Sequence, residues 1–339
     1  MCLRGIHKLV RRKDPEVPGH KGCAEMEKNM NAELKKHYLE TGPYTYAGLY
    51  ETYFCSLPDE PEELGNLISH QIVHRVTLRE GNTNANADLR YGDMTRYPWY
   101  RARCEDDIFL TAPAIAAELF RLDPRGFVKD RLTENKMILT CRYVSVLVSA
   151  IYKAKGIPCR SRAGFAPYFR QGVSMDHWIN QIWSDRENRW ITIDADGFYE
   201  GMLAGTPVTQ YDMKEGEFDW AAKAWLDIRR GRTKGTEFVY ADCLGTCSLK
   251  AVIRYLFYDF HALMNDEISY LFQPCYVDEK FETLSEDDFC ELDNLAELLL
   301  APDENFSALK RIWETNRKFR VMNSPLVGER DNLPLLERI

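Results

Sequence analysis

The sequence of 339 residues predicts an α+β fold, with a core of one helix and antiparallel strands between two mainly helical regions. Apolar residues at positions i, i+3, i+4 and i+7 predict the core helix, namely Val144, Leu147, Val148 and Ile151. Gly156 ends this helix, and Pro158 follows it. Three short runs of β-type residues come next, at 159–165, 177–183 and 190–193. A helix followed by such strands is typical of an α+β core.

The chain divides into four predicted regions. Residues 1–25 form a loose leader rich in charge, Gly and Pro, and residues 26–130 form a helical N-terminal region. Residues 131–215 contain the predicted core, and residues 216–339 form a helical C-terminal region. In this last region, Ser285 and Asp288 have the spacing of a capping box, which predicts a helix start there.

Apolar positions with helical spacing predict the helices of the N-terminal region. One set predicts a helix that continues to Val76; it consists of Leu64, Leu67, Ile68, Ile72 and Val76. A second set consists of Ala112, Ile115, Leu119 and Phe120. The composition of residues 81–86 predicts a loop between the two helices.

Composition and charge narrow the function classes. A net charge of −8 argues against nucleic acid as the main partner. No apolar run is long enough to cross a bilayer, and the first residues lack the apolar centre of a signal peptide. The ten cysteines are scattered and are expected to be thiols. We therefore expect a cytoplasmic protein that binds neither nucleic acid nor membrane; nothing in the sequence indicates an oligomeric state.

Cys141 is the strongest candidate for a nucleophile. Thr140 is a plausible N-cap, which places Cys141 in the first turn of the core helix. The free N–H groups and the dipole of a helix N-terminus favour a thiolate, and the same N–H groups can hold an oxyanion. A cysteine in this position is more often an inert buried thiol than a nucleophile. A catalytic role for Cys141 therefore requires a residue that can act as its general base.

His177 is the candidate base, because it lies in a predicted strand with an acid just downstream. If the strands pair as a hairpin around residues 184–189, strand alternation places Asp194 within about one pleat of His177. An acid there can accept a hydrogen bond from the imidazole and orient it. Asp196 has the same strand parity and is the second candidate, and Asp176, expected on the opposite face, is the third.

These residues lie in motifs that resemble the transglutaminase-like superfamily. The resemblance rests on the helix-opening Thr140-Cys141-Arg142, the run Gly156-Ile157-Pro158-Cys159-Arg160, the triplet Asp176-His177-Trp178 and the strand Trp190-Ile191-Thr192-Ile193-Asp194. It covers about residues 131–200. The runs at 163–169 and 259–267 are similar to a bacterial group of transglutaminase-like proteins with added helical regions. The resemblance implies a papain-like core with Cys141 as nucleophile, His177 as base and Asp194 as its orienting acid.

The predicted activity is acyl transfer through a cysteine acyl-enzyme, with release to water or to an amine. The substrate is expected to be an amide or (thio)ester of a small molecule or peptide, so the protein is a hydrolase or an acyltransferase. Candidate substrate-binding residues are Trp178, Arg162, Tyr168 and Asp176. A non-catalytic scaffold on the same fold and a peptide:N-glycanase-like hydrolase are the alternatives.

Neither a metal nor a cofactor is predicted. His70 and His74, four residues apart on a predicted helix, lack the Glu of a zinc-protease motif and are expected on the surface. Cys243 and Cys247 lack the second pair of ligands that a zinc site needs. Asp259 falls close to the apolar stripe of its helix and is expected to pair with an arginine in the core. A core salt bridge is also the alternative role of Arg162.

Overall fold

The computed structural model describes residues 30–75, 94–101, 105, 108–196, 208–240, 249–270, 272, 274 and 281–320. The α-helices are α1 (Ala32–Leu39), α2 (Glu51–Ser56), α3 (Pro61–Ser69), α4 (Ala112–Leu122), α5 (Cys141–Ala154), α6 (Ala221–Arg229), α7 (Leu249–Leu263), α9 (Glu286–Leu300) and α10 (Phe306–Thr315). The strands are β1 (Ile72–His74), β2 (Met137–Leu139), β3 (Cys159–Arg170), β4 (Val173–Ser184), β5 (Arg189–Ile193), β6 (Asp219–Trp220) and β7 (Phe238–Val239). The predicted α+β class is confirmed.

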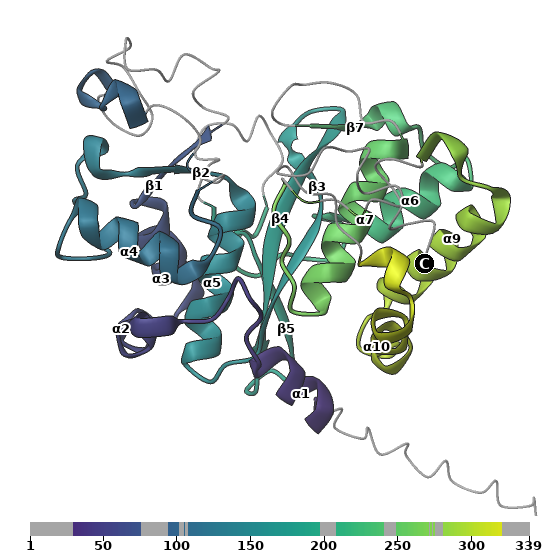
Figure 1. Cartoon of the computed structure of the whole chain (residues 1–339), viewed down its shortest axis with the longest axis horizontal. Coiled ribbons are helices and arrows are strands. Elements are labelled where there is room, and N and C mark those ends of the chain that lie inside the picture. Colours follow the sequence, from purple (N-terminus) through teal and green to yellow (C-terminus); the bar gives the residue numbers. More distant parts are fainter. Residues whose placement is uncertain are drawn as a thin grey trace, which may run out of the picture.

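The fold has helices on both sides of a small central sheet (Figure 1). Helix α5 contacts β3 and β4 from one side, and α6 and α7 lie on the other side of these strands. Helices α2, α3 and α4 extend the α5 side, while α9 and α10 extend the α7 side. The two faces of this arrangement correspond to two large apolar clusters, one with α5 at its centre and one with α7.

Helix α5 has the boundaries that the sequence predicts. Its N-cap is Thr140, although the Thr140 side chain makes no capping hydrogen bond. At the other end Gly156 adopts a φ of 75°, and the N–H of Ile157 bonds the carbonyl of Tyr152. This is the glycine-terminated helix end in which a left-handed residue lets the chain turn back.

Strands β3, β4 and β5 form an antiparallel meander in the order β5–β4–β3–β6, and β7 pairs with β4 in parallel. The predicted hairpin is present: Trp183 pairs with Trp190 and Gln181 with Thr192. Gln181 also donates a hydrogen bond to the Thr192 hydroxyl over 3.1 Å. This register places the residues after β5 beside the middle of β4, where His177 lies.

The predicted helix through Val76 is wrong in its second half. Helix α3 ends at Ser69, and Ile72–His74 instead form β1, which pairs in parallel with β2. His74 lies opposite Leu139, two residues before Cys141. The β-branched pair Ile72-Val73 is buried on this strand, because tertiary pairing with β2 overrides the helical spacing.

The C-terminal region contributes more than helices. Strands β6 and β7 both come from it, so the sheet continues past residue 215. The predicted capping box at the start of α9 is present, with Ser285 and Asp288 each bonding the backbone N–H of the other. The leader at 1–25, the loop at 81–86 and the pair Cys243 and Cys247 lie outside the described residues.

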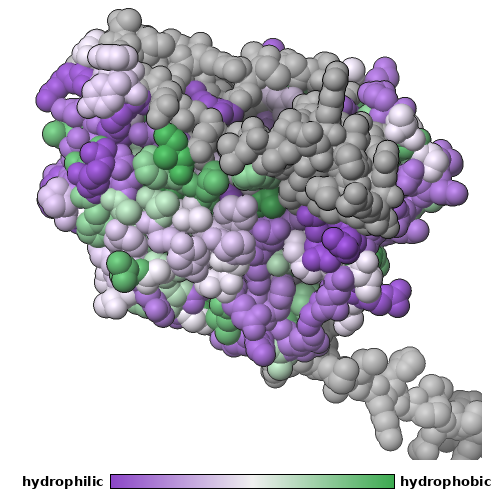
Figure 2. All heavy atoms as spheres, in the orientation of Figure 1, coloured by the Kyte–Doolittle hydropathy of each residue, from purple (hydrophilic) through white to green (hydrophobic). Residues whose placement is uncertain are grey.

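The described surface visible in Figure 2 is mostly polar, with apolar residues scattered among charged ones. Within the described residues, no helix is both long enough and apolar enough to cross a membrane.

Gly164 is needed where β3 meets β6. It lies opposite His177 on β4, and a Cβ atom at this position would lie 2.4 Å from the Asp219 carbonyl oxygen and 2.7 Å from the Phe218 ring. We expect Gly164→Ala to lower the free energy of unfolding by about 1–3 kcal/mol, because a well-packed interior has no room for an added methyl group. Urea denaturation measures this change, and a variant as stable as the wild type would contradict the packing argument.

Candidate active site

Cys141 is the first residue of α5 and a free thiol with 6% of its surface exposed. The N-terminal turn of a helix presents backbone N–H groups without intrahelical partners, which favour negative charge near the sulfur. The Tyr270 hydroxyl lies 3.3 Å from Sγ, within hydrogen-bond distance. The thiol is therefore nearly enclosed, with a polar group of the C-terminal region against it.

His177 connects the thiol to an acid. Its Nε2 lies 3.0 Å from Oδ2 of Asp194, and its ring is also hydrogen-bonded to the Cys141 side chain. Since Nε2 faces the carboxylate, Nδ1 is the nitrogen that faces the sulfur. His177 and Asp194 are 1% and 2% exposed, so this chain of hydrogen bonds is buried along its length. The structure thus brings together the three residues that the sequence proposes as a triad.

Asp194 is held in place through both carboxylate oxygens. Oδ2 accepts a second hydrogen bond from the Tyr168 hydroxyl at 2.7 Å, and Oδ1 accepts one from the Asp196 N–H at 3.2 Å. The Asp194 backbone exchanges hydrogen bonds with Gln210. Tyr168, predicted to contact substrate, therefore acts on the acid that orients the histidine.

The charges of the triad influence one another strongly. Burial by itself lowers the pKa of His177, but the Asp194 carboxylate and the Cys141 sulfur outweigh burial and place this pKa well above its usual value. Burial raises the pKa of the Cys141 thiol, and the positive charge of His177 opposes that rise. Ionisation of the thiol therefore depends on a protonated His177 beside it.

A second histidine–acid pair, which the sequence did not predict, also adjoins the thiol. Nε2 of His74 lies 3.3 Å from Oδ2 of Asp196, and both side chains are buried. The ligand atoms of His74, Cys141 and Asp196 all lie within 4.8 Å of one another. The prediction of His74 as a surface residue is wrong, because pairing of β1 with β2 brings it beside Cys141.

Burial favours the uncharged forms of both Asp196 and His74. Burial raises the pKa of Asp196 to about 8. The positive charge of His177 lowers this pKa, and the negative charge of Asp194 raises it. Burial also lowers the pKa of His74 well below its usual value, and the charge of His177 lowers it further. Asp196, the alternative candidate for orienting His177, thus pairs with another histidine.

We expect the stability of the protein to depend on pH through Asp196. Its folded-state pKa lies above the usual 3.8, so folding favours the protonated acid and stability falls as pH rises from about 4 to about 8. Asp196→Asn should remove this dependence, with a gain over the wild type of up to about 5 kcal/mol near pH 8. Urea denaturation of the wild type and Asp196→Asn from pH 4 to pH 8 measures the difference in free energy of unfolding, with a chelator present so that metal ions do not contribute.

The exposed Asp185 provides the control for that experiment. Its carboxylate pairs with Lys35 at 3.1 Å on the surface, and Asp185→Asn should change stability by less than about 1 kcal/mol at any of these pH values. An Asp196→Asn difference that stays constant from pH 4 to pH 8 would show that Asp196 is ionised in the folded protein throughout.

Two predicted substrate-binding residues lie in the core instead of on a cleft. The Arg162 guanidinium donates two hydrogen bonds to Asp259, at 2.7 and 2.9 Å, and lies over the Trp220 ring. This is the core salt bridge that was the alternative for Arg162, and it confirms that Asp259 pairs with an arginine. Trp178 is buried in the α7-side apolar cluster, with its ring 5.6 Å from that of Tyr258.

Asp176 lies closer to solvent than the triad and is half-buried. Asp176 accepts a hydrogen bond from the Tyr255 hydroxyl. Burial is the largest effect that raises the pKa values of Tyr255 and Tyr270, and the negative charge of Asp176 raises both further. Among the four predicted substrate-binding residues, Asp176 thus keeps the most accessible position. No sequence signal points to Tyr255 and Tyr270, because their contacts join α7 and the turn after it to the core.

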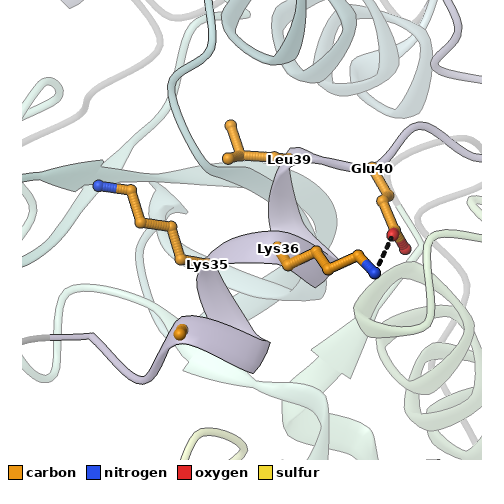
Figure 3. Close-up of a pocket in the computed structure, with 5 residues that line it drawn as sticks. Lys35, Lys36, Leu39 and Glu40 are labelled. Carbon is orange, nitrogen blue, oxygen red and sulfur yellow. Dashed lines mark ion pairs between the residues drawn. The ribbon is translucent and has the colours of Figure 1, made fainter.

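A surface hollow beside α1 is separate from this site. It has a volume of about 460 Å³ and is lined by Ala32, Lys35, Lys36, Leu39 and Glu40. Figure 3 shows Lys35, Lys36 and Leu39 on α1 and Glu40 just after it, with Lys36 and Glu40 paired to each other at 3.9 Å. No residue of the Cys141 site lines this hollow, so the chemistry of the chain is better sought at the thiol.

The chain has no significant match among protein-family models, curated proteins or solved structures.

Proposed function

We propose that this protein is a cysteine-dependent acyl-transfer enzyme of the transglutaminase-like kind. The observation that carries the proposal is the buried hydrogen-bond chain from Cys141 through His177 to Asp194. A thiol, a histidine that contacts it and an acid that orients the histidine together form the arrangement used for nucleophilic catalysis on unrelated folds. We further propose that the enzyme acts in the cytoplasm, where thiols stay reduced.

In the first half of the proposed reaction, the Cys141 sulfur attacks the carbonyl carbon of an amide or (thio)ester. The thiol proton passes to Nδ1 of His177, while Asp194 stabilises the resulting imidazolium. The carbonyl π electrons move to oxygen, and the N-terminal N–H groups of α5 are placed to stabilise that oxyanion. Collapse expels the amine, alcohol or thiol, which takes the proton from His177 and leaves an acyl-cysteine.

In the second half, His177 takes a proton from water or an amine as that nucleophile attacks the acyl-cysteine, and the thiol is regenerated. Because Cys141 is 6% exposed, we propose a small molecule or an extended peptide as the acyl donor instead of a bulky folded protein. Asp176 and Tyr270 are the residues near the thiol that are placed to contact the donor.

A chromogenic ester tests this function directly. With p-nitrophenyl acetate the full chain should release about one nitrophenolate per chain in a rapid burst, followed by slower turnover. Added amines that accelerate the slow phase would identify an acyltransferase, and unchanged turnover would identify a hydrolase. A wild-type chain with neither burst nor turnover would contradict the proposal and favour a non-catalytic scaffold on the same fold.

A further inference from the structure

Two side chains of metal-ligand type, those of His74 and Asp196, lie beside the sulfur of Cys141. We propose that His74, Cys141 and Asp196 form a Zn²⁺ site, and that a bound ion withholds the thiol from acyl transfer. The binding part of this inference stands on the cluster alone, whereas the inhibitory part rests on the function proposed above.

The separations between the three ligand atoms approach those that a zinc site needs. The sulfur, the imidazole nitrogen and the carboxylate oxygen all lie within 4.8 Å of one another. Zinc–ligand bonds of about 2.0–2.3 Å require ligand atoms about 3–4 Å apart, a separation that small side-chain rotations can reach. Nε2 of His74 and Oδ2 of Asp196 already lie at 3.3 Å.

The ligands come from three separately anchored elements. Cys141 opens α5, His74 ends β1, and Asp196 follows β5 by three residues. The parallel pairing of His74 with Leu139 fixes β1 beside the entry to α5. The Asp196 N–H bonds the Asp194 carboxylate, which fixes the third ligand relative to the triad. Such anchoring makes a preformed site, in which little ordering is needed when an ion binds.

The Asp196 side chain gives an independent indication of a ligand. It is 3% exposed, and within the described part of the chain neither of its oxygens makes a hydrogen bond. Buried carboxyl oxygens in proteins are normally hydrogen-bonded or bound to a metal. A cation between Asp196 and Cys141 would satisfy an oxygen whose contact among the described residues is the one to Nε2 of His74 at 3.3 Å.

Charge and ligand type favour zinc over harder cations. A thiolate and a carboxylate supply two negative charges, which balance one Zn²⁺ while the imidazole stays neutral. Full neutralisation matters because the three residues are buried, and an uncompensated charge there is costly. Sulfur and nitrogen donors suit zinc, whereas Mg²⁺ and Ca²⁺ prefer sites made of oxygen.

Bound Zn²⁺ would prevent nucleophilic attack by Cys141, because the sulfur lone pair would form the bond to the ion. The sulfur, Nε2 of His74 and a carboxylate oxygen of Asp196 each form a bond to the ion, which loses bound waters in return. The thiol proton, and that of Asp196 where it is protonated, pass to solvent. His177 is outside the ligand set and retains Asp194 as its partner. Chelation reverses these steps and restores the free thiol.

Cobalt substitution in the full-length chain tests the site without relying on activity. With Co²⁺ the wild type should show a cobalt–thiolate charge-transfer band at one ion per chain, and Zn²⁺ should displace it. Cys141→Ser should abolish the band, and His74→Gln or Asp196→Asn should raise the Kd at least about tenfold, since even outer-shell changes cost that much. His177→Ala should keep the band while losing acyl transfer, which separates the metal site from the catalytic base.

The exposed cysteines provide the matched control, because Cys55→Ser and Cys290→Ser should leave the band unchanged. A band that survives Cys141→Ser, or that is insensitive to His74→Gln, would overturn the proposed site. If the band behaves as expected but the metal-free wild type forms no acyl-enzyme, the site stands and the proposed function fails. If Zn²⁺ binds at Cys141 and acylation continues at the same rate, the inhibitory role fails.

Discussion

Cys141→Ala is expected to abolish ester turnover, and His177→Ala should reduce it to a similar residual level. In a Cys–His–Asp arrangement these residues act as one unit, so loss of either costs about 10⁴–10⁶-fold in kcat. Asp194→Asn should cost less, up to about 10⁴-fold, because the thiol and the base remain but the imidazole loses its orienting carboxylate. Steady-state release of nitrophenolate measures all three.

The electrostatics of the pair predict a second signature in His177→Ala. Burial raises the pKa of Cys141, and the charge and the hydrogen bond of His177 oppose that rise, so the thiol of this variant should react more slowly with iodoacetamide at pH 7. The exposed Cys55 and Cys290 should react at unchanged rates in the same sample. Turnover within tenfold of wild type in both Cys141→Ala and His177→Ala would exclude this triad as the catalytic unit.

Asp259→Ala is expected to cause the largest loss of stability, about 3–5 kcal/mol. It leaves the Arg162 guanidinium buried without the carboxylate that accepts its two hydrogen bonds, and it removes the acceptor of the Ala163 N–H. The paired replacement Arg162→Leu with Asp259→Leu should recover most of the loss, because apolar side chains of similar size remove both buried charges together. Urea denaturation gives the three free energies of unfolding.

The surface pair Lys35 and Asp185 provides the comparison for this ion pair. Its side chains are 40% and 73% exposed, and Lys35→Met should change stability by less than about 1 kcal/mol. Equal effects of Asp259→Ala and Lys35→Met would contradict the buried, hydrogen-bonded character of the Arg162–Asp259 contact.

The spacing of apolar residues along the chain predicted those elements whose formation depends on neighbouring residues. Helix α5 and the hairpin of β4 and β5 follow from the 3.6-residue and two-residue patterns, with Gly156 as a stop. Because the hairpin register follows from its turn, the approach of Asp194 to His177 could be expected from the chain alone. This is why the triad was the most predictable part of the site.

Contacts between distant segments could not be predicted in the same way. His74 lies beside Cys141 through a parallel pairing of two three-residue strands, and so short a strand cannot be distinguished from the end of a helix by its pattern. The preceding Ile72-Val73, both β-branched, was the signal that favoured a strand. Tyr270 reaches the thiol from 129 residues away, a distance over which the sequence pattern carries no information.

The central claim is that Cys141 carries the acyl group, and acid-quenched tandem mass spectrometry tests it most directly. After brief exposure of the full chain to p-nitrophenyl acetate, the acetyl group should be found on the Cys141 peptide, and this adduct should be absent in His177→Ala. Acetylation confined to exposed residues such as Cys55 and Cys290, or equal labelling of Cys141 with and without His177, would contradict the account.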